Sequence, residues 1–308
     1  MPGGFGEMKA LEELSTVSVD SRRALRFLDD LGRLRRLRVL GVKWCFGDDS
    51  SSLLQAVDFM ASLNRNLLFA ITSLSMDFHA TADFLDFFAD CWKPPIVFDK
   101  LELKSSTSYL PRIPLNVGSC DSRCLDVAVR SDNWDDLMVM SKSRYLTTLK
   151  LSVEGRAIAI DQGFYVLEVF WFQRREGGLG LEFKGGAMPS LEKLRLHFKL
   201  LPQENDSSGF GLHHLRCLER VHVIIDCDGA MANDVVSMEA AIRKEINEHR
   251  RSPLLKLSRE NEENMIQDGG QQSNQASSRG NPDHLTPSTG YRQTPETINR
   301  SAFQSEKI

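Results

Sequence analysis

The sequence contains no long apolar run and little excess of charge of either sign. Of its 308 residues, 41% are hydrophobic and 26% are charged, with a formal net charge of −4. No run reaches the roughly 18 apolar residues of a membrane-spanning helix, and the start, MPGGFGEMKA, lacks the apolar core of a signal peptide. Domains that bind nucleic acid through bulk charge are usually strongly basic. The sequence therefore predicts no membrane span and no nucleic-acid partner. It predicts a cytoplasmic location, and a nuclear location is the alternative.

Motifs for catalysis and metal binding are missing as well. The sequence has no GxxxxGKS/T phosphate loop, no GxSxG nucleophile elbow and no HExxH helix. Its six cysteines are scattered, and without a secretory signal we expect free thiols. Cys120-x-x-x-Cys124 and His213-His214-x-x-Cys217 offer ligands, but a zinc site needs closer and more regular pairs. We therefore expect no enzymatic activity, no catalytic residue, no cofactor and no metal.

What the chain does contain is a spacing of apolar residues, three apart and then two, that recurs along its length. In GAMPSLEKLRLHF, residues 186–198, it is formed by Leu191, Leu194 and Leu196. The other clear copies are Leu14, Val17 and Val19; Leu37, Leu40 and Val42; Ile71, Leu74 and Met76; Phe98, Leu101 and Leu103; Leu146, Leu149 and Leu151; and Leu218, Val221 and Val223. Two weaker copies are centred on Leu125 and Val127, and on Phe164, Leu167 and Val169. The pattern predicts about nine repeats.

The repeat length indicates a solenoid. Middle residues of successive copies lie at 17, 40, 74, 101, 125, 149, 167, 194 and 221, and most intervals fall in or near the range of about 20–29 residues typical of leucine-rich repeats. In each copy the last two apolar residues alternate along a short strand and face inward. One coil cannot bury its own apolar side, but stacked coils can, and their strands then pair into one parallel sheet. We predict an α/β leucine-rich-repeat solenoid with a concave parallel sheet and helices or irregular segments on the convex side.

Between and beyond the repeats, apolar periodicity predicts helices. We expect them over 21–36, 51–69, 81–92 and 239–251, the last being part of a C-terminal cap over 236–257. The solenoid is thus predicted over 1–257, and the polar composition of 258–308 predicts a disordered tail. Apolar repeat residues begin by Leu11 without a separate N-terminal cap, so we expect this first coil to be covered by a preceding segment or by self-association.

The side chains that alternate with the buried ones should form the concave face. We predict that this face binds proteins, because its polar side chains are mixed in sign and show no repeated motif for one small ligand. The predicted protein-binding residues are Ser18, Lys43, Ser75, Asp77, Glu102, Lys104, Lys150, Ser152, Arg195, His197, His222 and Ile224.

Several segments resemble the leucine-rich-repeat region of plant intracellular nucleotide-binding immune receptors, in particular the coiled-coil class of grasses. GGAMPSLEKLRLHF is similar to the segment before a late repeat of that family. GLHHLRCLERVHVIIDCDGA with EAAIRKEINEHRRSPLLKL is similar to its closing repeat and capping helix, and PGGFGEMKALEELSTVSV resembles a repeat junction. The resemblance covers roughly residues 2–257. The nucleotide-binding domain of these receptors has no counterpart in the sequence, so the family's nucleotide chemistry is not carried over to any residue, and we expect a truncated or stand-alone form.

The resemblance implies a role in plant defence. We expect a non-enzymatic recognition module of innate immunity and the hypersensitive response, whose partner is a pathogen effector, a guarded host protein or a receptor's nucleotide-binding domain. The alternative from the same fold is a substrate adaptor of an F-box-type ubiquitin ligase. An F-box would have to precede the repeats, and the first 20 residues are too few to hold one.

Overall fold

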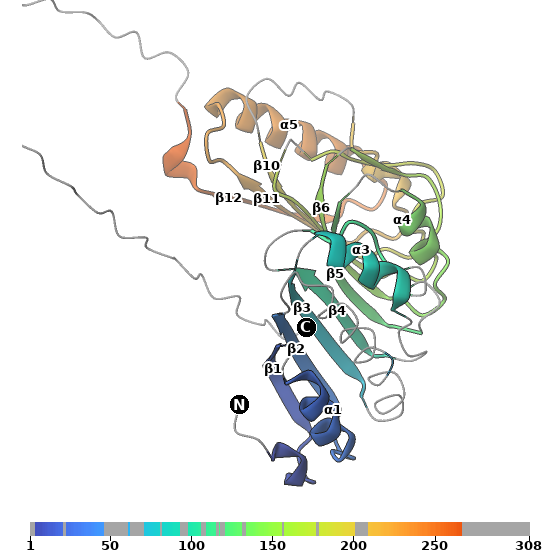
Figure 1. Ribbon diagram of the computed structural model, residues 1–308. Helices are drawn as coiled ribbons and strands as arrows, with labels where there is room; N and C mark the ends of the chain where they lie inside the picture. The colour runs from blue at the N-terminus through green and yellow to red at the C-terminus, as the bar shows by residue number, and fades with distance from the viewer. Residues whose placement is uncertain are drawn as a thin grey trace, which may run out of the picture. The chain divides into compact units, whose positions relative to one another are not determined.

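Ten parallel strands form one sheet in the structure, a computed structural model (Figure 1). The described residues are 4–20, 23–45, 61, 71–80, 82–92, 98–105, 109–114, 117, 121–130, 134–155, 157–176, 179–200 and 209–266. The strands lie side by side in chain order: β1 (Glu13–Asp20), β2 (Val39–Cys45), β3 (Ser73–His79), β4 (Lys100–Ser105), β5 (Cys124–Arg130), β6 (Thr148–Glu154), β8 (Val169–Arg174), β10 (Lys193–Lys199), β11 (Arg220–Asp226) and β12 (Leu254–Glu260). The predicted stack of repeats is confirmed.

One face of the sheet is the apolar core. The anchor residues of eight successive strands pair in register and are at most 3% exposed: Leu40, Leu74, Leu101, Leu125, Leu149, Phe170, Leu194 and Val221. A third buried residue extends several strands, as Trp44 does in β2 and Phe198 in β10. Full burial of one such side chain stabilises the fold by about 1.5–3 kcal/mol. The core therefore runs from coil to coil as one continuous row.

The first residue of each copy lies in the turn that enters the strand. Leu191 is fully buried, and its amide donates to the carbonyl of Met188, which closes the turn. The next amide, that of Glu192, donates to the carbonyl of Glu168 in the preceding coil, and that of Glu219 donates in turn to Glu192. The three-then-two spacing thus reflects a turn that stacks on its neighbours, followed by a strand.

Two copies have a different register from the predicted one. Around residue 167 the inward residues are Leu167, Phe170 and Phe172, whereas Val169 is only partly buried, so the predicted copy was shifted by three residues. In β1 the pairing with β2 shifts between Leu14 and Val17. Thr16 adopts a positive φ of 60° there, which marks a bulge.

Helices cover the apolar face. They are α1 (Ala24–Gly32), α3 (Ala82–Cys91), α4 (Trp134–Ser141) and α5 (Ala232–Glu248), with short 3-10 turns η1 (Phe5–Glu7), η3 (Leu212–His214) and η4 (Glu262–Asn264). Phe88 of α3 packs on Phe78 of β3 with ring centroids 4.5 Å apart. The helices predicted over 21–36 and 81–92 are confirmed, and the one over 51–69 falls almost wholly outside the described residues. Some coils return through strands instead: β7 (Ile158–Ile160) pairs with β9 (Leu181–Phe183).

The C-terminal cap is a long helix tied to the last coils by polar contacts. Helix α5 begins at Ala232, before the predicted start, and β12 continues to Glu260. The carboxylate of Glu245 accepts hydrogen bonds from the amides of Phe210 and Leu212, and Nε2 of the buried His249 lies 3.1 Å from the carbonyl oxygen of Leu215. The disordered tail was predicted over 258–308, but its first residues, 258–266, form the end of β12 and the segment around η4; the remainder lies outside the described residues.

At the other end of the sheet, η1 packs against α1. The ring of Phe5 packs against that of Phe27 in a tilted arrangement with centroids 5.5 Å apart, and the amide of Gly4 donates to the carboxylate of Asp30. Met8 remains 60% exposed, and Leu11 and Leu14 are only partly buried. Self-association through this coil stays a prediction.

Candidate functional site

The side chains opposite the core form the polar face of the sheet, which is the candidate site. Its central row follows the strand register through Ser75, Glu102, Asp126, Lys150, Trp171, Arg195, His222 and Lys256. A second row contains Ser18, Lys43, Asp77 and Lys104, and further along the sheet Ser152, Gln173, His197, Ile224 and Ser258. All twelve predicted residues lie on these rows, and eleven of them are at least partly exposed.

Ile224 is the exception, because it is only 3% exposed and was wrongly predicted to be accessible. Its register neighbours are His197 on β10 and Ser258 on β12. The imidazole of His197 reaches across β11 to the carboxylate of Glu260, with Nε2 and Oε2 3.2 Å apart. This contact crosses the strand that carries Ile224, and the isoleucine is closed off from solvent rather than available to a partner.

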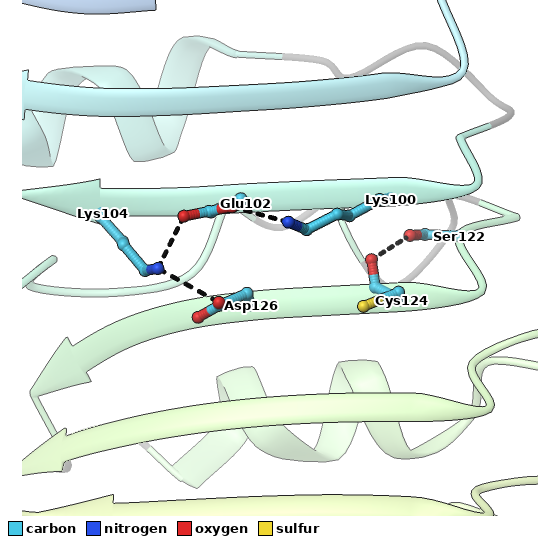
Figure 2. Close-up of polar contacts among 6 residues, drawn as sticks. All are labelled: Lys100, Glu102, Lys104, Ser122, Cys124 and Asp126. Atoms are coloured by element: carbon cyan, nitrogen blue, oxygen red, sulfur yellow. Dashed lines mark hydrogen bonds and ion pairs between the residues drawn. The ribbon is translucent and has the colours of Figure 1, made fainter. Parts of the chain in front are cut away.

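Four charged residues on β4 and β5 pair with one another, and we call them the paired cluster (Figure 2). They are Lys100, Glu102, Lys104 and Asp126. In the segment KLELK, residues 100–104, the alternation of a strand places both lysines and the glutamate on one face. The ammonium of Lys104 lies 2.6 Å from Glu102 and 3.1 Å from Asp126, and that of Lys100 lies 3.0 Å from Glu102. Two cations thus neutralise two carboxylates.

These contacts shift the pKa values of the cluster. Burial raises the pKa of Glu102, but the hydrogen bonds and charges of Lys104 and Lys100 outweigh it, so that the pKa is lowered. Burial lowers the pKa of Lys104, but the carboxylates of Asp126 and Glu102 outweigh it and the pKa is raised. Both groups therefore stay charged over a wider pH range than they would in the unfolded chain.

Further along the same row, Trp171 on β8 lies between two cations. The ammonium of Lys150 on β6 is 4.0 Å from the centroid of the Trp171 ring, and the guanidinium of Arg195 on β10 is 4.8 Å from it. Each such contact stabilises by about 0.5–1 kcal/mol at an exposed site. Alternation along the strands adds more cations to the same face, and we call the set the tryptophan cluster: Lys150, Trp171, Lys193, Arg195, Arg220 and Lys256.

Sequence reasoning missed Trp171 and Asp126. Trp171 was overlooked because the weak copy was placed on Phe164, Leu167 and Val169, a register that left no outward residue at 171. The correct signal was present, since Leu167, Phe170 and Phe172 have the same three-then-two spacing with phenylalanine in place of leucine. Asp126 lies between Leu125 and Val127 of the other weak copy, where strand alternation places it outward.

Polar pairs return at the C-terminal end of the face. Lys199 on β10 pairs with Asp228 at 2.7 Å, and its hydrogen bond to that carboxylate raises the pKa of Lys199. The pKa of His197 is lowered, chiefly by burial, although the charges of Glu260 and Asp226 oppose the shift. At neutral pH the imidazole of His197 is therefore neutral, and its contact with Glu260 is polar rather than an ion pair.

Among the residues that the structure describes, no group of three or more His, Cys, Asp and Glu side chains is arranged to hold a metal ion. Cys45, Cys124, Cys217 and Cys227 are free thiols, and burial raises the pKa of Cys124 and of Cys227. No helix within the described ranges combines the length and apolarity needed to cross a bilayer.

Comparison with known proteins agrees with the repeat architecture. The chain is 28% identical over 264 residues to disease resistance protein RGA5 of Oryza sativa subsp. japonica, an alignment that covers 82% of this chain and 23% of that protein. The chain thus spans about a quarter of the length of this relative. The family model described as a leucine-rich repeat region matches residues 1–255. With that match covering most of a chain whose strands stack in register, the protein belongs to the leucine-rich repeat region family.

Proposed function

We propose that this chain is a non-enzymatic protein-recognition module of plant innate immunity, which senses a pathogen effector or regulates an immune receptor through the polar face. The similarity to a disease resistance protein supports the biological setting. The fold supports the mode of action, since solenoids present extended binding surfaces built from many repeats.

One observation carries the proposal. Each of ten strands contributes side chains to one continuous face in parallel register, while the described helices contribute to the core of the opposite face. The accessible residues of this face, which are at least partly exposed, are mixed in charge, from Asp77 and Glu102 on early strands to Arg195 and Lys256 on late ones. Polar and charged groups arranged across a broad surface give specificity for a protein partner with complementary groups.

Partner capture from leaf tissue tests the proposal. The tagged chain would be compared with a face variant, Lys150→Glu with Arg195→Glu and His197→Glu. A matched control reverses two exposed charges on α5, Arg243→Glu with Lys244→Glu. We expect at least one captured defence protein to be lost from the face variant and kept by the control.

Unchanged partner binding by the face variant would contradict the proposal. If every captured protein binds the face variant as well as it binds the wild type, the polar face is not the recognition surface. A cell-death assay with a co-expressed immune receptor of the resembling class then separates sensing from regulation, because only a regulator changes ion leakage when no pathogen protein is present.

A further inference from the structure

The cations of the tryptophan cluster have no acidic partner among the residues that the structure describes. Across the residues that the structure describes, ion pairs engage Lys100, Lys104, Arg130, Lys199 and Arg259 on or beside the sheet, but none engages the five cations of the cluster. All five are exposed or only partly buried. A concentrated, uncompensated positive charge on one face raises the local potential and attracts anionic groups.

The cluster has a defined length and defined limits. Lys150 and Lys256 stand on the same row, separated by four strand steps of about 4.8 Å, or about 19 Å in all. The exposed carboxylates of Glu168, Glu192 and Glu219 lie one residue before β8, β10 and β11, which sets one border. Asp226 and Glu260 set the other border. The positive region is thus a band across the strands, about as long as six residues of extended chain.

We infer that this band binds an extended acidic segment of a protein partner, with aspartate or glutamate side chains meeting Lys150 and Arg195 on either side of Trp171. The inference rests on the proposed function and names the chemistry of the partner. The indole ring holds the two cations in place, since both lie against it from flanking strands. Preorganised cations lose less side-chain freedom when a carboxylate arrives.

A nucleic acid fits this band less well than an acidic peptide. Proteins that bind single strands stack bases on open aromatic faces, whereas the Trp171 ring is approached by a cation from each neighbouring strand. The carboxylates at both borders of the band would also repel a long phosphate backbone. Carboxylate side chains need only the cationic groups, which remain directed at the ring and accessible from solvent.

Fluorescence anisotropy with defined probes tests the inference. The full chain would be titrated into a labelled hexapeptide of alternating glutamate and aspartate, its glutamine and asparagine counterpart, and a short DNA duplex, all at low ionic strength. We expect the acidic peptide to bind more tightly than either its amide counterpart or the DNA duplex. Its Kd should rise about tenfold or more in the Lys150→Gln, Arg195→Gln double variant, since two desolvated charge contacts are lost.

A matched variant separates the site from general charge. Arg243→Gln with Lys244→Gln removes the same number of cations from α5 and should change the Kd by less than about twofold, because screened charges on another surface contribute little. Trp171→Ala should weaken binding while leaving the net charge unchanged, which a purely electrostatic effect would not produce.

Several results would overturn the inference. The acidic peptide could show no binding at all, which removes the ligand class. The two double variants could raise the Kd of the peptide equally, or the DNA duplex could bind more tightly than the peptide through Lys150 and Arg195. The outcomes for the two proposals remain separable. If captured partners need the polar face but the acidic peptide does not bind, only the acidic-segment inference fails. If the peptide binds and no captured partner needs the face, only the proposed function fails.

Discussion

The paired cluster on β4 and β5 and the tryptophan cluster on β6 to β12 lie on the same face, and both include residues of its central row. In the first, Glu102 and Asp126 neutralise Lys100 and Lys104 at distances of 2.6–3.1 Å. In the second, Lys150 and Arg195 lie against an indole ring and meet no carboxylate within the described residues. The scaffold is the same under both, so the difference comes from the outward residues alone.

This difference separates two uses of charge on a solenoid. Charged side chains that form ion pairs with one another join adjacent coils. They contribute little to binding a partner, because the partner would first have to displace the existing ion pair. Charges held against an aromatic ring remain available, because a cation–π contact leaves the ammonium or guanidinium hydrogens free to meet an acceptor. A charged residue on such a face therefore indicates a binding site only when its intramolecular partners are known.

The largest expected effect tests whether both regions rest on one core. Leu101→Ala, beneath the paired cluster, and Leu194→Ala, beneath the tryptophan cluster, should each destabilise the fold by about 2–5 kcal/mol, because each leaves a cavity at a fully buried anchor. Urea unfolding measures both. Arg195→Ala, which removes an outward side chain, should cost about 0.5 kcal/mol. A loss for Leu194→Ala as small as that for Arg195→Ala would show that the facing is wrong.

The next effect separates the two clusters directly. Lys104→Met leaves the buried Asp126 without its cation and should cost about 1–2 kcal/mol. Lys150→Met removes an equivalent lysine that holds no carboxylate and should stay within about 0.5 kcal/mol. Both are lysine-to-methionine changes on the same face, so each controls for the other in thermal or urea unfolding. Equal losses would mean that pairing does not distinguish the clusters.

Most of the fold follows from the sequence, because the apolar spacing of each coil is local. Leu37, Leu40 and Val42 are three buried positions within six residues, and the same interval works wherever aliphatic residues fill it. It failed where phenylalanine replaced leucine, at Phe170 and Phe172, and where the bulge at Thr16 broke the register. One displaced copy was enough to hide Trp171, the residue on which the candidate site is centred.

The polar face is less predictable because its contacts join coils of unequal length. Lys104 meets Asp126 only if β4 and β5 pair at the observed register, which depends on the whole segment between them. His197 and Glu260, which meet across the strand that carries Ile224, are 63 positions apart in the sequence. Alternation shows which side chains point outward, but only the stacking shows which of them pair.

A pH titration sharpens the comparison on the side of the paired cluster. The pKa of Glu102 is lowered in the folded chain, since the hydrogen bonds and charges of Lys104 and Lys100 outweigh its burial. Its contribution is present above the ordinary glutamate pKa of about 4.3 and is lost as the pH falls through the folded value. We expect Glu102→Gln to cost about 1 kcal/mol at pH 7 and much less in acid. A cost that does not change with pH would contradict the ion pairing.

The smallest expected effect concerns His197, which stands between the tryptophan cluster and the polar pairs at the C-terminal end. Burial lowers its pKa, as do the charges of Arg195 and Arg175, whereas Glu260 and Asp226 act in the opposite direction. Because the folded pKa is below that of the unfolded chain, the unfolded state binds more protons as the pH falls below about 6.5, and stability should decrease.

Urea unfolding at pH 7.5 and 5.5 measures this effect against His197→Gln. We expect the wild type to lose about 0.5 kcal/mol more than the variant between the two conditions. A wild type that gains stability on acidification would show that the charge of Glu260 prevails, which would make His197 a member of the polar pairs. The expected loss instead means that His197 is neutral at pH 7 and adds no positive charge beside the lysines and arginines of the tryptophan cluster.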